Sequence, residues 1–147
     1  SGRCDVLSTD QSALHILKKK LTHQDEYTIL DTGISIEPLS LMIRDDDISW
    51  FKLVRWVVFA LIKAEEIGFY KEYKDTLVPL RNNQERILQL KKYRNDFSKV
   101  SWAYDLILYI GNYGQIFERN LTRPFDIERG KNALIREGGV LYSPDFN

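Results

Sequence analysis

Sulfur-containing and imidazole side chains are scarce in this sequence. Its 147 residues include one cysteine, one methionine and two histidines. A single cysteine excludes a disulfide within this sequence, so Cys4 is interpreted as a small apolar residue. The alternative is a thiol whose partner lies in another chain or in a part of the protein outside this sequence. His15 and His23 lie at a spacing that fits no common metal-ligand motif. The sequence therefore predicts neither a disulfide framework nor a metal site.

Net charge and long apolar runs are also absent. The 21 basic side chains balance the 21 acidic ones, which gives a formal net charge of zero. Without a basic excess the chain is not expected to bind nucleic acid. The most apolar run, "WVVFALI" at residues 56–62, is bracketed by Arg55 and Lys63 and is too short to span a bilayer. The overall composition, 44% apolar and 29% charged residues, is typical of a globular domain.

Helical patterns dominate what is present. The predicted helices cover residues 10–21, 48–66, 69–78, 83–94, 100–120 and 123–139. The helix over 48–66 is the clearest, because the acidic residues Asp45 to Asp47 favour its start and Gly68 favours its end. Its apolar side chains surround most of the circumference, so this helix is expected to be buried on several sides.

Strand signals are few and lie near the start. Short extended segments are predicted at residues 4–7, 26–30 and 37–44. The helices carry more apolar surface than such strands can cover. Two explanations stay open: the helices form a bundle, or most of a sheet lies outside this sequence.

Four segments resemble one protein family. In chain order, "GRCDVLSTDQSAL", "EPLSLMIRDDDISWFKLVRWVVFALIKAEEIG", "WAYDLILYIGNYGQIFERN" and "GKNALIREGGVLYSPDFN" are similar to the carboxyl-terminal part of periplasmic general L-amino-acid-binding proteins. These are solute receptors of ABC-type amino-acid uptake systems, in extracellular solute-binding family 3. The resemblance implies an α/β fold with two lobes and a ligand cleft, of which this chain would be a helix-rich part with few strands.

The resemblance also implies a division of the chain. Residues 1–33 would end lobe two, residues 34–38 would form the return crossing, and residues 39–147 would belong to the carboxyl-terminal part of lobe one. The side chains that usually grip the ligand carboxylate and sandwich its side chain would lie upstream. The chain is therefore expected to carry only part of the binding site, with no cofactor and no catalytic residue.

Asp10 is the candidate for ligand contact. In the wider family of amino-acid receptors, an aspartate directly after a strand of the pattern GR-x-D takes the ligand's α-ammonium. The resemblance places Asp10 at that position, and Thr9 and Gln11 are further candidates for contact with the ligand. A carboxylate suits an ammonium because it accepts strong charge-assisted hydrogen bonds. The alternative is that Asp10 caps the helix that follows it. The implied partners are L-amino acids and a membrane permease, and the implied location is the periplasm.

Two other classes of function stay open. The two-lobed fold also hosts some enzymes, but no further acid or base in this sequence suggests catalysis. The chain is alternatively a truncated homologue that no longer binds amino acids and self-associates through apolar helices. Whatever its function, the isolated chain is expected not to be a simple monomer. It should form a homo-oligomer or associate with a missing amino-terminal half.

Overall fold

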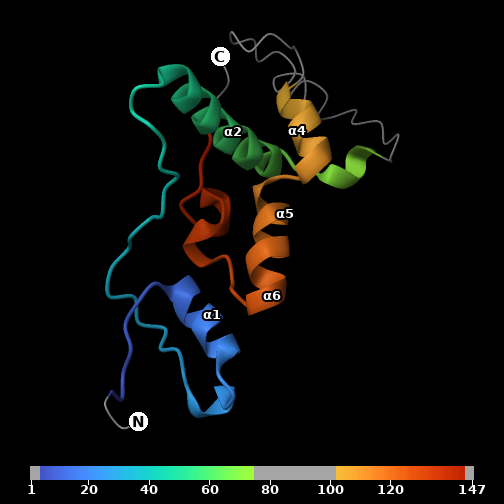
Figure 1. Cartoon of the computed structure of the whole chain (residues 1–147). Helices are drawn as coiled ribbons and strands as arrows, with labels where there is room; N and C mark the ends of the chain where they lie inside the picture. Colours follow the sequence, from blue (N-terminus) through green and yellow to red (C-terminus); the bar gives the residue numbers. More distant parts are fainter. Residues whose placement is uncertain (1–3, 75–101, 145–147) are drawn as a thin grey trace.

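The fold is an assembly of short helices around one long helix. The computed structural model describes residues 4–74 and 102–144. Its helical elements are α1 (Gln11–Lys20), η1 (Gln24–Glu26), α2 (Ile48–Glu66), η2 (Lys71–Lys74), α4 (Trp102–Ile110), α5 (Tyr113–Phe117), η3 (Glu118–Thr122), α6 (Arg123–Phe125), η4 (Gly130–Asn132) and η5 (Ile135–Glu137). Figure 1 shows α1 at one end of the molecule and α2 with α4 toward the other. The predicted helix over 83–94 lies outside the described residues.

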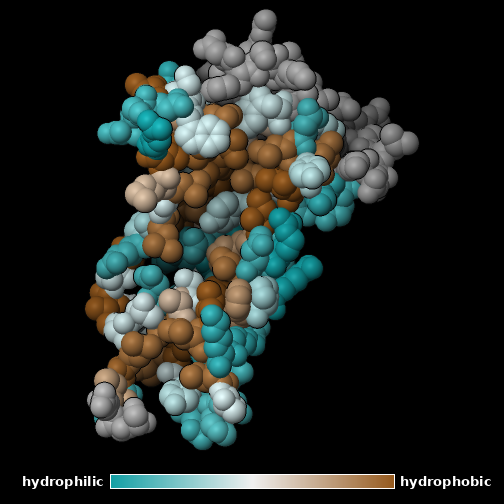
Figure 2. Space-filling view, viewed as in Figure 1, coloured by the Kyte–Doolittle hydropathy of each residue, from teal (hydrophilic) through white to brown (hydrophobic). Residues whose placement is uncertain are grey.

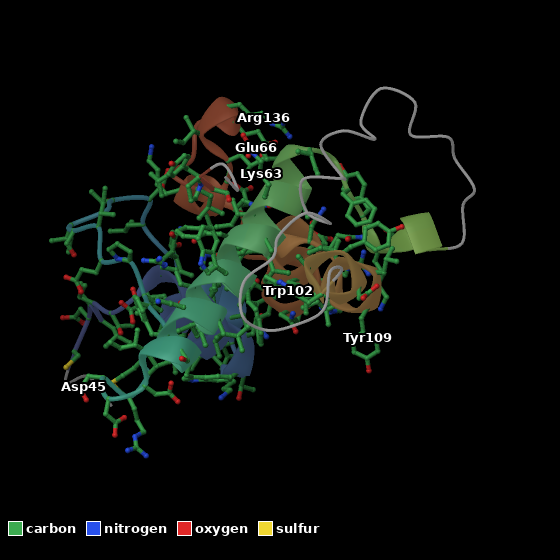
Figure 3. All side chains as sticks on the ribbon, turned by 90° about the horizontal axis from the view of Figure 1, so that it is seen from above. Asp45, Lys63, Glu66, Trp102, Tyr109 and Arg136 are labelled. Carbon is green, nitrogen blue, oxygen red and sulfur yellow. The ribbon has the colours of Figure 1, made fainter. Side chains whose placement is uncertain are left out.

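Helix α2 has the bounds that the sequence predicts. The Asp47 carboxylate accepts a hydrogen bond from the Trp50 amide at 2.8 Å, which satisfies one of the unpaired donors at the helix start. At the other end, Gly68 adopts a φ of +70° and Arg136 donates to the Glu66 carbonyl at 2.6 Å. Figure 3 shows Arg136, Glu66 and Lys63 gathered at this end of the helix. Both ends of α2 are therefore fixed by side chains.

The core forms where the second half of α2 meets α4. Its buried residues are Ala60, Ala64, Ile67, Phe69, Ala103 and Ile107. The small alanines let the two helices approach closely, and the Phe69 ring stacks on Tyr104 with centroids 5.2 Å apart. The first half of α2 is different, because Trp50 and Phe51 stay exposed. The expected burial on several sides is thus met only in the second half.

The predicted helix over 100–120 is wrong as one element. Gly111, at a φ of +89°, ends α4, and Asn112 then begins α5. Asn112 accepts from the Gln115 amide at 3.0 Å while the Gln115 side chain accepts from the Asn112 amide at 3.1 Å, which is a capping box. The buried Asn112 amide group also donates to the Phe69 carbonyl at 2.9 Å. This junction therefore ties the α4–α5 corner to the end of α2.

The predicted helix over 123–139 is also wrong. Asp126 adopts the left-handed region with a φ of 57° and ends α6 after one turn. The chain then continues through the single turns η4 and η5, and the latter ends at Gly138 with a φ of 86°. The segment folds back on itself, because Leu134 and Leu141 form an isolated bridge.

The predicted strands are not formed in the described residues. Residues 4–7, 26–30 and 37–44 contain no paired strand, and in Figure 1 residues 27–47 follow a long irregular trace to the start of α2. A β-preferring segment becomes a strand only beside a neighbour that accepts and donates its backbone hydrogen bonds. Such a neighbour is lacking among residues 4–74 and 102–144.

Apolar surface remains open as a result. Figure 2 shows brown, apolar surface gathered where α2 and α4 lie and continuing along the side of the extended segment. The exposed large apolar side chains of that segment and the start of α2 include Ile34, Ile36, Leu39, Leu41, Met42, Ile48, Trp50 and Phe51. Separately, none of the helices in the described ranges is long and apolar enough to cross a membrane.

Candidate functional site

Asp10 lies at the junction between the extended amino-terminal segment and α1. Its backbone is extended, with φ −53° and ψ 140°, and its carbonyl accepts the Leu14 amide at 3.0 Å. Its side chain makes no capping hydrogen bond to α1. The alternative interpretation, a carboxylate that caps the helix, is therefore not what the structure shows. The backbone of Asp10 starts the helix and its carboxylate stays exposed.

Thr9 and Gln11 flank this carboxylate in sequence and are exposed as well. Three consecutive polar residues at the start of α1 are thus exposed in the structure. They are not enclosed, since all three residues are exposed to solvent. A carboxylate there has its full capacity for accepting hydrogen bonds, and an ammonium is a suitable donor.

Helix α1 is held only loosely to the rest. Its ion pair with the α6 region joins Lys19 to Asp126 at 3.5 Å, and both side chains are largely exposed. An exposed pair of this kind contributes less than about 1 kcal/mol. The Asp10 surface therefore sits on an element with few fixed contacts to the core.

A second polar cluster, which the sequence did not predict, fixes α5 and the carboxyl-terminal segment to α2. The two terminal nitrogens of the Arg129 guanidinium donate to the two oxygens of the Glu65 carboxylate, at 2.6 and 3.2 Å. It also donates to the Asn132 carbonyl and lies 5.6 Å over the Tyr113 ring and 5.4 Å over the Phe117 ring. We call these residues the Arg129 cluster. Arg129 has its donors engaged by protein groups, so the cluster is structural.

The pKa of Tyr113, the tyrosine of the Arg129 cluster, reflects the burial of its side chain. The pKa of Tyr113 is raised above 10.0, mainly because burial disfavours the phenolate; Arg129 opposes this shift and Glu65 adds to it. The neighbouring Gly114 leaves room for the ion pair, because a Cβ atom there would lie 2.8 Å from both Arg129 and Glu65. Neither feature has a local sequence pattern, since Glu65 and Arg129 are 64 residues apart.

The acidic run before α2 does not form a cation site. Asp46 is paired with Arg44, and Asp47 caps the helix. These residues and Trp50 line only a shallow hollow. In the part of the chain that the structure describes, no group of His, Cys, Asp and Glu side chains is arranged to hold a metal ion. The interpretation of this run as a helix start is confirmed.

Comparisons with known proteins agree on one kind of relative. AapJ of Rhizobium johnstonii, the "General L-amino acid-binding periplasmic protein", is 42% identical over 98% of this chain. BztA of Rhodobacter capsulatus, the "Glutamate/glutamine/aspartate/asparagine-binding protein", is 36% identical over 99% of it. A solved ABC-transporter periplasmic binding protein from Brucella ovis, with glutathione bound, matches with a TM-score of 0.80 and 35% identity over 99% of the chain. No family model matches the chain.

The share of each relative that is covered is as informative as the identity. The match spans 44% of AapJ, 45% of BztA and 48% of the Brucella ovis chain. The resemblance described above predicted such a partial match, with a helix-rich chain that contains few strands. Over nearly its whole length, the chain is therefore similar to periplasmic amino-acid-binding proteins of ABC transporters, and it spans just under half the length of the relatives it matches.

Proposed function

We propose that this chain is part of the solute-binding component of an ABC-type amino-acid uptake system. It carries one side of a site for L-amino acids and works in the periplasm with a membrane permease. The names of the relatives support this proposal, since AapJ and BztA are both named for binding amino acids.

The observation that carries the proposal is the free carboxylate of Asp10. A helix-capping aspartate would have its oxygen bonded to the first amides of α1, and the Asp10 side chain makes no such bond. In this role Asp10 accepts hydrogen bonds from the ligand's α-ammonium, and Thr9 and Gln11 add polar contacts beside it. The ligand carboxylate is held by residues outside this chain.

The proposal includes a division into lobes. Residues 1–33 end lobe two, residues 34–38 cross between the lobes, and residues 39–147 belong to lobe one. The division is supported by where packing occurs: the buried core lies in α2 and later elements, whereas α1 contains no buried residue. The ligand cleft then runs between α1 and the later elements.

Calorimetric titration with a panel of L-amino acids tests this function. The sample is a full-length receptor in which this chain replaces the matching part of AapJ; we call it the AapJ chimaera. The chimaera is expected to bind L-amino acids, and the isolated chain is expected to bind them weakly or not at all. Micromolar binding by the isolated chain would show that the site is not shared. A folded chimaera that binds no amino acid would contradict the proposed function.

The exposed apolar residues support a second candidate. A truncated homologue that does not bind amino acids would use Ile36, Met42 and Trp50 to associate with further copies of itself. Sedimentation of the isolated chain at low micromolar concentration separates the two candidates when it is combined with the titration. The second function is favoured if the isolated chain forms a stable homo-oligomer and the AapJ chimaera binds no amino acid.

A further inference from the structure

An ion pair joins the helix that presents Asp10 to the later part of the chain. The Lys19 ammonium of α1 lies 3.5 Å from the carboxylate of Asp126, the residue that directly follows α6. The two residues are 107 positions apart in the sequence. In Figure 1, α1 lies beside α6, while α2 and α4 lie toward the other end of the molecule. We call this contact the α1–α6 ion pair.

The backbone of Asp126 is fixed in an uncommon conformation. Among the described residues other than glycine, Asp126 alone has a positive φ, at 57°. Aspartate adopts this left-handed region more readily than most residues do. The Asp126 amide donates to the Thr122 carbonyl at 2.8 Å, and the Thr122 hydroxyl donates to the carbonyl of the buried Ile127 at 2.8 Å. The α6 side of the ion pair is therefore anchored to the body of the fold.

The α1 side of the ion pair is held by few other contacts. Helix α1 contains no buried residue, and the chain between α1 and α2 has no helix or strand beyond the single turn η1. The position of α1 relative to the later elements therefore depends on weak noncovalent contacts. In such a setting a single exposed ion pair is a sizeable share of what holds α1 in place.

We propose that the α1–α6 ion pair is a contact between the two lobes that favours the closed receptor and so strengthens amino-acid binding at Asp10. The inference rests on the proposed function, which assigns α1 to lobe two and α6 to lobe one. The pair forms only when the lobes approach each other, so its attraction lowers the free energy of the closed state alone. Lys19 and Asp126 are positioning residues in this role, because they act through the lobes and not through contact with the ligand.

The size of the effect follows from the exposure of the pair. The two side chains are 45% and 86% exposed, so water and salt screen their attraction. When the closed state is the minor one without ligand, the apparent affinity changes by the same factor as the closed population. Loss of the pair should therefore weaken binding by about twofold to fivefold. At about 1 M salt this difference should disappear.

A double-mutant cycle in the AapJ chimaera measures this effect. Lys19→Gln and Asp126→Asn remove the charges with little change in size, and asparagine tolerates a left-handed backbone. In calorimetric titration at low salt, each variant should weaken L-amino-acid binding by about twofold to fivefold. The double variant should be no weaker than either single variant, because all three lose the same contact.

A second ion pair on the surface provides the matched control. Arg123 and Glu118 lie 3.2 Å apart within one continuous helical run, and their side chains are also largely exposed. This pair does not involve α1. Arg123→Gln and Glu118→Gln should therefore leave the affinity for L-amino acids unchanged.

Carbodiimide cross-linking detects the α1–α6 ion pair directly. The reagent activates the Asp126 carboxylate, and the Lys19 amine then displaces the reagent as a urea. The resulting amide joins the two side chains with the net loss of one water. Peptide mass spectrometry of the chimaera should find this product, and saturating L-amino acid should raise its yield at least about twofold. Lys19→Gln should abolish the product, whereas Lys20→Gln should not.

Three results would overturn this proposal and leave the proposed function in place. The first is unchanged affinity for Lys19→Gln and Asp126→Asn in a chimaera that binds amino acids. The second is a double variant in which the two losses multiply, since the charges would then act independently. The third is a cross-link yield that does not rise with amino acid. Failure of the proposed function is distinct, because the unmodified chimaera would then bind no amino acid.

Discussion

Replacing Arg129 by leucine should destabilise the chain more than any other single ion-pair substitution in the described residues. The change removes two hydrogen bonds to Glu65 and leaves that carboxylate, whose side chain is 11% exposed, without its partner. Breaking a buried pair in this way costs about 3–5 kcal/mol. Because the Arg129 side chain is 24% exposed, we expect the low end, about 3 kcal/mol. That is a large share of the roughly 5–15 kcal/mol that stabilises a typical domain.

Urea unfolding followed by tryptophan fluorescence measures this effect. With an m-value of about 2 kcal/mol per molar, the midpoint should fall by roughly 1.5 M. The matched control is Arg123→Leu, since Arg123 pairs with Glu118 at 3.2 Å on the surface; its loss should change the free energy of unfolding by less than about 1 kcal/mol. Adding Glu65→Leu to Arg129→Leu removes the unpaired charge and should recover part of the loss. Equal urea midpoints for the two arginine variants would refute the reasoning, as would a double variant that is less stable than Arg129→Leu.

Three further predictions concern local structure. Asp47→Ala should lower the free energy of unfolding by about 1 kcal/mol through loss of the α2 cap, whereas Asp45→Ala, which removes no cap, should leave it nearly unchanged in the same urea titration. Gly139→Ala should destabilise by about 1–3 kcal/mol, because its Cβ would overlap the Ala133 carbonyl, while Gly33→Ala has free space; comparable thermal midpoints would contradict this. Burial raises the pKa of Tyr113, so the stability that this group contributes is complete below about pH 10 and declines as the pH rises through the folded-state pKa. Tyr113→Phe should remove that decline, and urea midpoints at roughly pH 9 and 11 measure it.

Local signals predicted α2 well because its start, length and end are all encoded nearby. Asp47 and Gly68 stand at the two ends, and the apolar pattern between them is continuous. The break between α4 and α5 also had a local signal: Gly111 and Asn112 are followed by Gln115, which is the spacing of a capping box. The interpretation as one helix gave the apolar periodicity more weight than this signal.

Other features depend on residues that are distant in sequence. The contact of Arg129 with Glu65 joins positions 64 residues apart, and no local pattern predicts it. The predicted strand at 37–44 failed because a strand needs a neighbour, which local β preference cannot supply. For Asp10, a cap and a ligand contact both require a carboxylate before a helix, so the sequence left the two roles open. The absence of a capping bond in the structure removes the first.

Asp10 is the residue on which the account depends most, and titration of its asparagine variant is the most direct test. Asn keeps the size of the side chain and removes the charge that the ligand's ammonium requires. In the AapJ chimaera, Asp10→Asn should weaken L-amino-acid binding by roughly 10- to 100-fold, the effect of losing a charge-assisted hydrogen bond. The control Asp25→Asn, at an exposed aspartate of η1, should leave the affinity unchanged. Equal affinities for Asp10→Asn and the unmodified chimaera would contradict the assigned role.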